Sequence, residues 1–229
     1  MIICHPYRFI FLKTSKTAGT SIEIALSKFC GASDVITPIS LADEAIRRDL
    51  GYPGPRNYRP PFAEYSSRDW AFAAATLRRK ELYNHIPARE ARRMIEPAVW
   101  GAYFKFCFER NPWDRIISQY YWRCPTEPRP SLDEFMTRKV LERLDRKGFG
   151  IYTIRGKVAV DRVCRFERLQ EELEWLRAHL GLPEPLVLPS AKGSFRADRR
   201  PYREVFDEGQ RRRVAEVFGR ELALLGYEF

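Results

Sequence analysis

The stretch from residue 8 to residue 23 constrains the fold of this chain more than any other part of the sequence. Residues 8–13 are mostly apolar and have the length of a buried strand, and a loop of hydroxyl and lysine side chains follows at 14–20. Apolar residues then recur at the spacing of a helix face, at Ile22, Ala25, Leu26 and Phe29. A strand, a cationic turn and a helix N-terminus form an anion site, because free N–H groups and the helix dipole attract negative charge. The stretch therefore predicts a bound phosphate or sulfate group.

The order of residues in this loop excludes the two commonest phosphate-binding loops. The nucleoside-triphosphate loop has lysine directly after its last glycine, whereas here Lys16 precedes Gly19, and Thr20 and Ser21 follow it. The three spaced glycines of a dinucleotide loop are also absent. Neither a standard kinase loop nor a nicotinamide loop fits.

A second strand, expected at residues 102–108, also ends in an anion site. Arg110 stands at its tip, Asn111 is a natural N-cap, and Pro112 suits the first position of the next helix. Parallel strands present their carboxyl ends at one edge of a sheet, where ligands bind. We therefore expect the turns at 14–20 and 110–112 to face one another and to hold a nucleotide with phosphates at both ends.

Strands alternate with helices along the rest of the chain. A third strand is expected at 160–166, and helices are expected at 41–50, 88–95, 169–180 and after the caps at Asn111, Ser131 and Asp207. This pattern predicts an α/β fold, a three-layer sandwich with a central mostly parallel sheet, in a single domain over 1–229. The Pro-, Gly- and aromatic-rich segment at 51–62 cannot continue a helix or a central strand and is expected to form a lid that faces the substrate.

Composition limits which binding partners and which cellular compartment are expected. The 40 basic and 30 acidic residues leave a formal charge of +10, which favours anionic partners over a plain solvated surface without deciding between them. The 5 cysteines are irregularly spaced, which argues against a disulfide framework or a zinc site. No segment approaches the ~18 apolar residues of a membrane span, so a cytoplasmic protein without a transmembrane segment is expected.

Both anion turns resemble one family of enzymes. The run Lys16-Thr17-Ala18-Gly19-Thr20-Ser21 is similar to the 5′-phosphosulfate loop of sulfotransferases. Arg110 and Ser118, eight residues apart, resemble their 3′-phosphate motif. The resemblance is closest to the carbohydrate-type branch and its bacterial relatives. It implies a P-loop-like sulfotransferase fold and 3′-phosphoadenosine 5′-phosphosulfate as the co-substrate that donates the sulfuryl group.

The resemblance also implies roles for individual residues. Lys16 is then catalytic, because its ammonium would neutralise the oxygen between sulfur and the 5′-phosphate as that bond breaks. The residues that would bind the nucleotide are Lys16, Thr17, Ala18, Gly19, Thr20, Ser21, Arg110, Ser118, Lys192, Gly193 and Ser194. The alternatives are a solvated loop lysine, hydroxyls that only cap a helix, an ion pair of Arg110 with Asp114, and a plain basic loop around residue 193.

The base that takes the acceptor's proton is less well defined. His85 is the first candidate, since it precedes a helix near the aromatic segment and histidine titrates near neutral pH. A structural histidine that caps this helix is an equal alternative, and Glu23 and Glu167 are other candidate bases. Phe166 or Trp113 could pack on the adenine, although aromatic residues at such positions more often belong to a core.

Together these features predict a sulfotransferase that modifies a hydroxyl, less readily an amine, of a carbohydrate or glycolipid, with no metal. One alternative is a nucleotide or sugar kinase, which would need magnesium and a nucleoside triphosphate. Another is a basic nucleic-acid-binding module, although no zinc-finger spacing or single-strand-binding motif supports nucleic acid as a partner.

Overall fold

A five-stranded sheet forms the centre of the molecule in a computed structural model that describes residues 1–77, 79–189 and 200–229. Its strand order is β3-β1-β2-β4-β7. The bounds are β1 Ile2–Cys4, β2 Phe9–Phe11, β3 Val35–Ile36, β4 Phe104–Glu109 and β7 Arg162–Arg165. Strand β1 is antiparallel to β2 and β3, and β2, β4 and β7 pair in parallel, so every strand except β1 runs in the same direction. The predicted central, mostly parallel sheet is confirmed.

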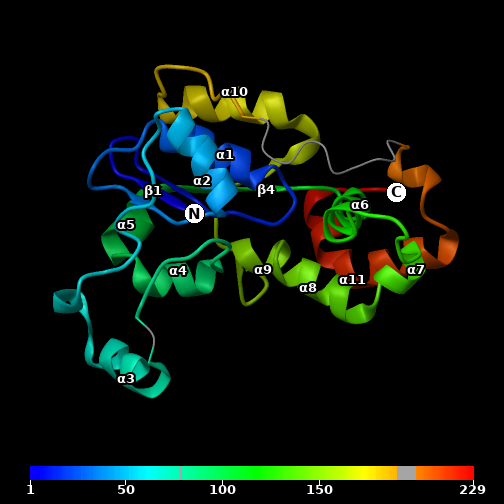
Figure 1. Ribbon diagram of the computed structural model, residues 1–229, viewed down its shortest axis with the longest axis horizontal. Helices are drawn as coiled ribbons and strands as arrows, with labels where there is room; N and C mark the ends of the chain where they lie inside the picture. Colours follow the sequence, from blue (N-terminus) through cyan, green and yellow to red (C-terminus); the bar gives the residue numbers. More distant parts are fainter. Residues whose placement is uncertain (78, 190–199) are drawn as a thin grey trace.

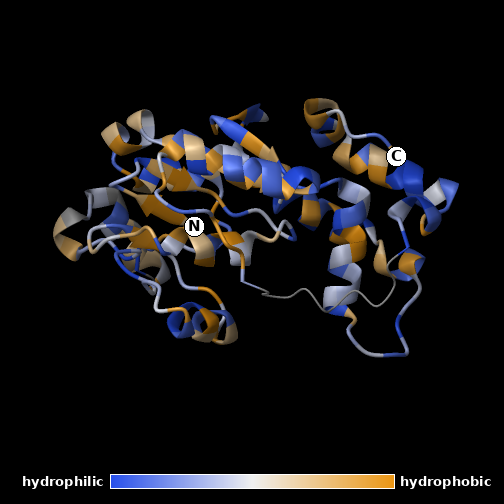
Figure 2. Ribbon diagram, turned by 90° about the horizontal axis from the view of Figure 1, so that it is seen from above, coloured by the Kyte–Doolittle hydropathy of each residue, from blue (hydrophilic) through white to orange (hydrophobic). Residues whose placement is uncertain are grey.

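Helices cover both faces of this sheet (Figure 1). One face carries α1 Gly19–Ser27, α2 Leu41–Asp49 and α10 Leu169–Leu180, and the other carries α4 Ala88–Met94, α5 Pro97–Ala102 and α9 Phe149–Tyr152. The side chains of successive strand residues point to opposite faces of the sheet. Phe9 and Phe11 join the core with α1 and α10, while Ile10 joins the core with α4 and α9. In Figure 2 the orange strands lie between helices that are part blue and part orange, as this layering requires.

A third core lies beyond the end of the sheet, on the right of Figure 1. It is built by α6 Pro112–Arg123, α7 Leu132–Phe135, α8 Arg138–Arg146 and α11 Glu208–Leu225. Its buried apolar side chains include Ile116 and Ile117 from α6, Leu144 from α8 and Phe218 from α11. This helical cluster stands beside the carboxyl ends of β2 and β4, where the two predicted turns lie.

Helix starts and ends follow the capping signals in the sequence. The Asn111 side chain accepts a hydrogen bond from the Trp113 N–H at 3.1 Å and begins α6. Complete capping boxes begin α7 at Ser131 and α11 at Asp207, and α10 ends at Gly181, whose φ of 66° suits glycine. The helix starts predicted at Asn111, Ser131 and Asp207 and the helix end predicted at Gly181 are therefore confirmed.

Short elements were missed. Strands β1 and β3, and the hairpin of β5 Thr153–Ile154 with β6 Lys157–Val158, are two or three residues long, too short to show a period. The remaining elements are 3₁₀ turns η1 Phe62–Glu64, η2 Phe166–Arg168 and η3 Tyr202–Glu204 and helix α3 Ser67–Thr76. Helix α3 begins with a Ser66–Asp69 capping box and stands apart from the main body in Figure 1. Within the described residues, no helix is both long enough and apolar enough to cross a lipid bilayer.

The guanidinium of Arg115 links the sheet to the helical cluster. It is fully buried and pairs with Glu109 at the end of β4 and with Glu221 of α11, at 2.9 Å from the latter. Gly148 lies against it: a Cβ at this position would stand 2.1 Å from Arg115 Nη1. All three charged side chains lie in the interior of the protein.

Replacing Gly148 with alanine should destabilise the protein by about 1–3 kcal/mol, because the added methyl group collides with a guanidinium that two carboxylates hold in place. Urea unfolding followed by tryptophan fluorescence would measure the change. Gly101→Ala in α5 is the matched control, since a Cβ there meets no atom within 4 Å and should be neutral or stabilising. Equal stability of the two variants would contradict the packing argument.

Candidate functional site

The two anion turns meet in space. Strands β2 and β4 pair in parallel with Phe11 opposite Phe106, so their following turns leave the sheet side by side. Arg110 Nη1 donates a hydrogen bond to the Lys16 carbonyl oxygen at 3.2 Å and joins the turns directly. Both turns line a cavity of about 990 Å³ between the sheet end and the helices α6 and α8.

The loop before α1 has the backbone geometry of an anion-binding nest. Lys16 and Ala18 are in the left-handed region, with φ of 67° and 56°, which turns neighbouring N–H groups toward a common point. Helix α1 begins at Gly19 without a side-chain cap and without an acidic residue in its first turn. Neither Thr20 nor Ser21 caps the helix, so its first N–H groups remain available to an anion.

Hydrogen bonds fix this loop to β4 and to the end of α8. Thr14 Oγ1 donates to the Phe108 carbonyl of β4 and lies 2.9 Å from Thr17 Oγ1. The Ser15 N–H donates to the Lys147 carbonyl at 2.9 Å and thus ties the loop to the end of α8. Thr17 is fully buried, so its hydroxyl supports the loop from inside the fold.

A buried ion pair lies beneath the loop. Lys13 Nζ is 2.9 Å from Glu23 Oε2, and Arg47 Nη2 is 3.7 Å from Glu23 Oε1. Burial would raise the pKa of Glu23, but the N-terminal amine, Lys13 and Arg47 outweigh it and lower this pKa to about 2. Gly19 is needed here, since a Cβ would lie 2.8 Å from Lys13 Cγ. Glu23 does not line the cavity, and it joins α1 to Lys13 after β2 and to Arg47 of α2.

Arg110 and Ser118 both line the cavity from α6 and its N-terminal turn. Arg110 Nε donates to Asp114 Oδ2 at 2.8 Å, and its guanidinium lies 4.2 Å from the Phe166 ring centroid. The expected alternative of an Arg110–Asp114 ion pair is therefore present, and it orients the guanidinium while leaving it at the cavity wall. Phe166 also lines the cavity, whereas Trp113 is buried in the helical core.

Lys16 faces α6 across the cavity. Its ammonium lies 5.0 Å from the ring centroid of Trp122, a cation–π contact that limits where the side chain points. The whole predicted loop lines the cavity with it: Lys13, Thr14, Ser15, Thr17, Ala18, Gly19, Thr20 and Ser21.

His85 joins these residues from the segment before α4. It lines the cavity, and its Nδ1 lies 2.9 Å from the Lys13 carbonyl oxygen. A carbonyl only accepts, so Nδ1 carries the proton and the neutral ring has its lone pair on Nε2. Burial, then the charges of Lys13 and Lys147, lower the pKa of His85 to about 4. The imidazole is therefore neutral near pH 7.

Other predicted residues fall outside the cavity. Glu167 accepts from the Asn111 N–H at 2.6 Å and from the Tyr227 hydroxyl at 2.9 Å, and it is not among the described lining residues. The described aromatic residues at 52–70 do not line the cavity either, so the structure does not support the expected lid. Lys192, Gly193 and Ser194 lie outside the described residues.

The sequence reading missed one wall of the cavity. It is formed by Arg123 at the end of α6, Lys139 and Arg143 of α8, and Lys147 directly after α8. Helix α8 itself was not predicted, although the four-residue spacing of three of these cations was the signal that could have revealed a charged helix face.

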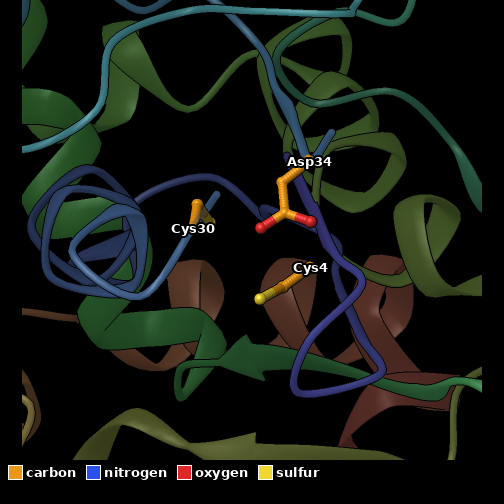
Figure 3. Close-up of side chains that lie close together, drawn as sticks. All are labelled: Cys4, Cys30 and Asp34. Carbon is orange, nitrogen blue, oxygen red and sulfur yellow. The ribbon is translucent and has the colours of Figure 1, made fainter. Parts of the chain in front are cut away.

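One group of potential metal ligands was also not foreseen. Cys4, Cys30 and Asp34 come together with their ligand atoms within 4.8 Å of one another (Figure 3). Both Asp34 oxygens already accept backbone hydrogen bonds, from His5 at 2.7 Å and from Gly31 at 2.6 Å. A hydrogen bond to Cys4 and burial raise the pKa of the Cys30 thiol, which favours the protonated form over a metal-binding thiolate. These hydrogen bonds hold the end of β1 against the turn after α1, so the cluster has a structural role.

Comparison with known proteins agrees with the two-turn geometry. The model of the Sulfotransferase family matches residues 1–150, which include both turns and His85. The chain belongs to the sulfotransferase family. An uncharacterized protein of Archaeoglobus fulgidus is 34% identical over 106 residues, covering 44% of this chain and 87% of that protein. No solved structure matches the chain significantly.

The neutral state of His85 predicts a pH-dependent stability. Its pKa is about 4 in the folded protein against 6.5 when unperturbed, so the unfolded state binds more protons between these values and stability falls as the pH drops. Relative to neutral pH the loss at pH 5 should be about 2 kcal/mol. Urea unfolding at both pH values would measure it.

The variant His85→Asn should show a smaller loss, because its amide can donate to the Lys13 carbonyl but does not titrate. The same comparison on His179→Gln, at a histidine that stacks on Trp175 outside the cavity, measures the effect of losing a histidine elsewhere in the fold. A His85→Asn protein that loses as much stability as the unmodified chain would contradict the buried neutral imidazole.

Proposed function

We propose that this sulfotransferase-family chain transfers a sulfuryl group from 3′-phosphoadenosine 5′-phosphosulfate to a hydroxyl group. The observation that carries the proposal is the direct hydrogen bond from Arg110 to the Lys16 carbonyl at 3.2 Å. It brings two anion-binding turns to one cavity, which suits a nucleotide with charged groups at both ends. The proposal includes a P-loop-like sulfotransferase fold that spans residues 1–229 as one domain.

The two turns take different ends of the donor. The nest at Lys16 and Ala18, with the uncapped N-terminus of α1, binds the 5′-phosphosulfate through backbone N–H groups. Arg110 and Ser118 bind the 3′-phosphate, for which a guanidinium offers two parallel hydrogen bonds. Phe166, which packs on Arg110, offers a flat apolar surface for the adenine next to that phosphate.

In the transfer step the acceptor oxygen forms a bond to sulfur as the bond from sulfur to the bridging oxygen of the 5′-phosphate breaks. The leaving group is 3′,5′-bisphosphoadenosine, and negative charge grows on its bridging oxygen. The Lys16 ammonium neutralises this charge more strongly in the transition state than in the ground state. The transition state resembles that of phosphoryl transfer, so positioning and electrostatics dominate. The fixed cations of the site neutralise the leaving group, and the proposal therefore needs no metal.

His85 is the proposed general base. The hydrogen bond of Nδ1 to the Lys13 carbonyl fixes the tautomer, and the lone pair on Nε2 takes the proton of the acceptor hydroxyl. Its depressed pKa, about 4, keeps it in the accepting form across the neutral pH range. The acceptor proposed is a carbohydrate or glycolipid hydroxyl.

A thermal-shift comparison tests the donor class. A ligand that binds only the folded state raises the midpoint of unfolding. The proposal expects 3′,5′-bisphosphoadenosine to stabilise the protein more than ATP with magnesium and more than an oligonucleotide. A shift with ATP and magnesium alone would favour a kinase-like phosphotransferase, and a salt-sensitive shift with the oligonucleotide alone would favour a nucleic-acid-binding module.

Lys16→Ala should lower kcat by about 10²–10³-fold while binding of 3′,5′-bisphosphoadenosine weakens much less, because the ammonium acts mainly on charge that develops in the transition state. Transfer from labelled donor and calorimetric titration of the product nucleotide would separate the two effects. Lys157→Ala, at an exposed lysine of β6, is the control. Full turnover by Lys16→Ala would refute the role of Lys16.

Arg110→Ala should weaken binding of 3′,5′-bisphosphoadenosine about 10- to 100-fold and binding of adenosine 5′-monophosphate far less, since only the former has a 3′-phosphate for the guanidinium. Calorimetry with both nucleotides measures the difference. Equal losses for the two nucleotides would remove the assignment of Arg110 to the 3′-phosphate and point to its contacts with Asp114 and Lys16 instead.

A further inference from the structure

One part of the chain projects from the main body and leaves large apolar side chains exposed. Residues 62–77, the α3 projection, comprise η1 and α3 and stand apart from the sheet and its covering helices (Figure 1). None of its described side chains belongs to the three hydrophobic cores. Phe62, Trp70 and Leu77 are 48%, 51% and 94% exposed. The fold of this chain therefore does not account for the apolar surface of the α3 projection.

The α3 projection has contacts of its own. The ring centroids of Phe62, Tyr65 and Trp70 lie 5.2 to 5.5 Å from one another. The Lys80 ammonium pairs with Asp69 of α3 at 3.1 Å, and the Lys80 N–H donates to the Tyr65 hydroxyl at 2.8 Å. These contacts fix the partly exposed rings of Phe62 and Trp70 against each other, so the apolar side chains form a defined surface.

The residue at the end of α3 does not suit its backbone position. Leu77 follows the last turn of α3 with a φ of 55°, in the left-handed conformation for which glycine or asparagine is the usual choice. A leucine costs free energy in this conformation, and solvent surrounds its side chain. Local structure thus gives no reason for leucine here, and the exposed side chain indicates a contact outside the chain.

Positive charge accompanies this apolar surface. Residues 59–93 include 8 basic and 4 acidic residues, and two of the acidic ones, Asp69 and Glu81, are already in ion pairs. Helix α4 follows the α3 projection in the sequence and lies on the same side of the sheet (Figure 1). The exposed cations of this part of the chain include Arg79, Arg89, Arg92 and Arg93. An anionic surface is the partner whose charge complements them.

An anionic lipid surface fits this combination better than a second copy of the chain. Tryptophan, phenylalanine and leucine next to arginines are typical of elements that lie in the headgroup region of a bilayer. Two copies would bring two basic surfaces together, and these repel each other. A stable protein interface also buries about 1,200 Å² or more, whereas a bilayer accepts a small projecting element.

We propose that the α3 projection docks on membranes that contain anionic lipids, with Trp70 and Leu77 in the headgroup region and the arginines of α4 at the lipid phosphates. The segment after the projection leads to His85 at the cavity, so docking keeps the proposed site near the membrane surface. This last step rests on the proposed function, and it narrows the acceptor to a glycolipid.

Vesicle binding tests the docking without turnover. Vesicles of phosphatidylcholine with phosphatidylglycerol should sediment the protein at low salt, and vesicles of phosphatidylcholine alone should bind it about tenfold less or weaker. High salt should weaken the binding, because salt screens exposed charges. Brominated acyl chains should quench tryptophan fluorescence, and Trp70→Phe should lose most of this quenching. Absence of binding at low salt, or unchanged quenching in Trp70→Phe, would overturn the proposal.

Leu77→Asn separates docking from folding. Asparagine adopts the left-handed conformation readily, so this variant should be at least as stable as the unmodified chain in urea unfolding. Its affinity for anionic vesicles should fall about tenfold, because an inserted leucine side chain is lost. Leu41→Asn is the control, at a leucine that is 91% exposed in α2 on the opposite face of the sheet. Equal affinities of the two variants would contradict the docking surface.

A charge variant tests the role of α4. Arg92→Gln combined with Arg93→Gln should weaken binding to the anionic vesicles about tenfold or more. Arg211→Gln combined with Arg212→Gln removes the same net charge from exposed positions of α11 and should have a much smaller effect. An equal loss in both pairs would show that net charge alone attracts the protein, and it would overturn the assignment to this face.

Sedimentation velocity without lipid tests the competing occupant. A concentration-dependent dimer that Leu77→Asn abolishes would show that a second copy covers the α3 projection, and it would overturn the proposal.

Acceptor assays connect docking to the reaction. Transfer to a glucosyl lipid in anionic vesicles should fall about tenfold in Leu77→Asn, while transfer to methyl β-glucoside in solution should not change. Vesicle binding that Leu77→Asn weakens supports the docking surface even where 3′,5′-bisphosphoadenosine fails to bind, a result that would count against the donor alone. Transfer to soluble sugars by a protein that does not bind vesicles would reject the docking surface and leave the proposed function standing.

Discussion

The parallel pairing of β2 with β4 is the constraint on which the site depends. Because the two strands run side by side in the same direction, both of their following turns leave the sheet at one edge. The Thr14 hydroxyl reaches back to the Phe108 carbonyl, and Arg110 reaches across to the Lys16 carbonyl. An antiparallel arrangement would send the two turns to opposite ends of the molecule, and no common ligand could touch both.

The positively charged side chains of this molecule occupy two kinds of environment. The cations that build the framework are buried against carboxylates, as Lys13 is against Glu23 and Arg115 against Glu109. The cations of the α8 wall face the cavity instead. At His85, burial and then nearby positive charge disfavour the imidazolium and lower the pKa. A site that attracts anions thereby also keeps its proposed base unprotonated.

The sequence predicted the parts of this structure that local rules determine. The strand–loop–helix at 8–23 and the Asn111-Pro112 helix start have strong local signals, and together with the parallel-sheet rule they placed Lys16 near Arg110. Contacts between distant residues escaped it. The sequence could not show that the Glu167 carboxylate is bound to Asn111 and Tyr227. Helix α8 went unpredicted, although Val140, Leu141 and Leu144 give it an apolar face. Burial and pairing, which decide chemical roles, are properties of the fold.

The family match ends at residue 150, and this boundary bears on where specificity arises. Among the described lining residues, all but Phe166 lie within the matched region, so the helices that follow mainly support the site from outside. Helix α11 does so through the Glu221 contact with Arg115, which fixes α6 against the end of β4. The turns around Lys16 and Arg110 are held by backbone geometry and buried ion pairs, which leaves little room for change. Lys139 and Arg143 line the same cavity from α8 and form no ion pair with the described residues, so substitutions at these two positions should disturb the fold less than substitutions at Lys13 or Arg115.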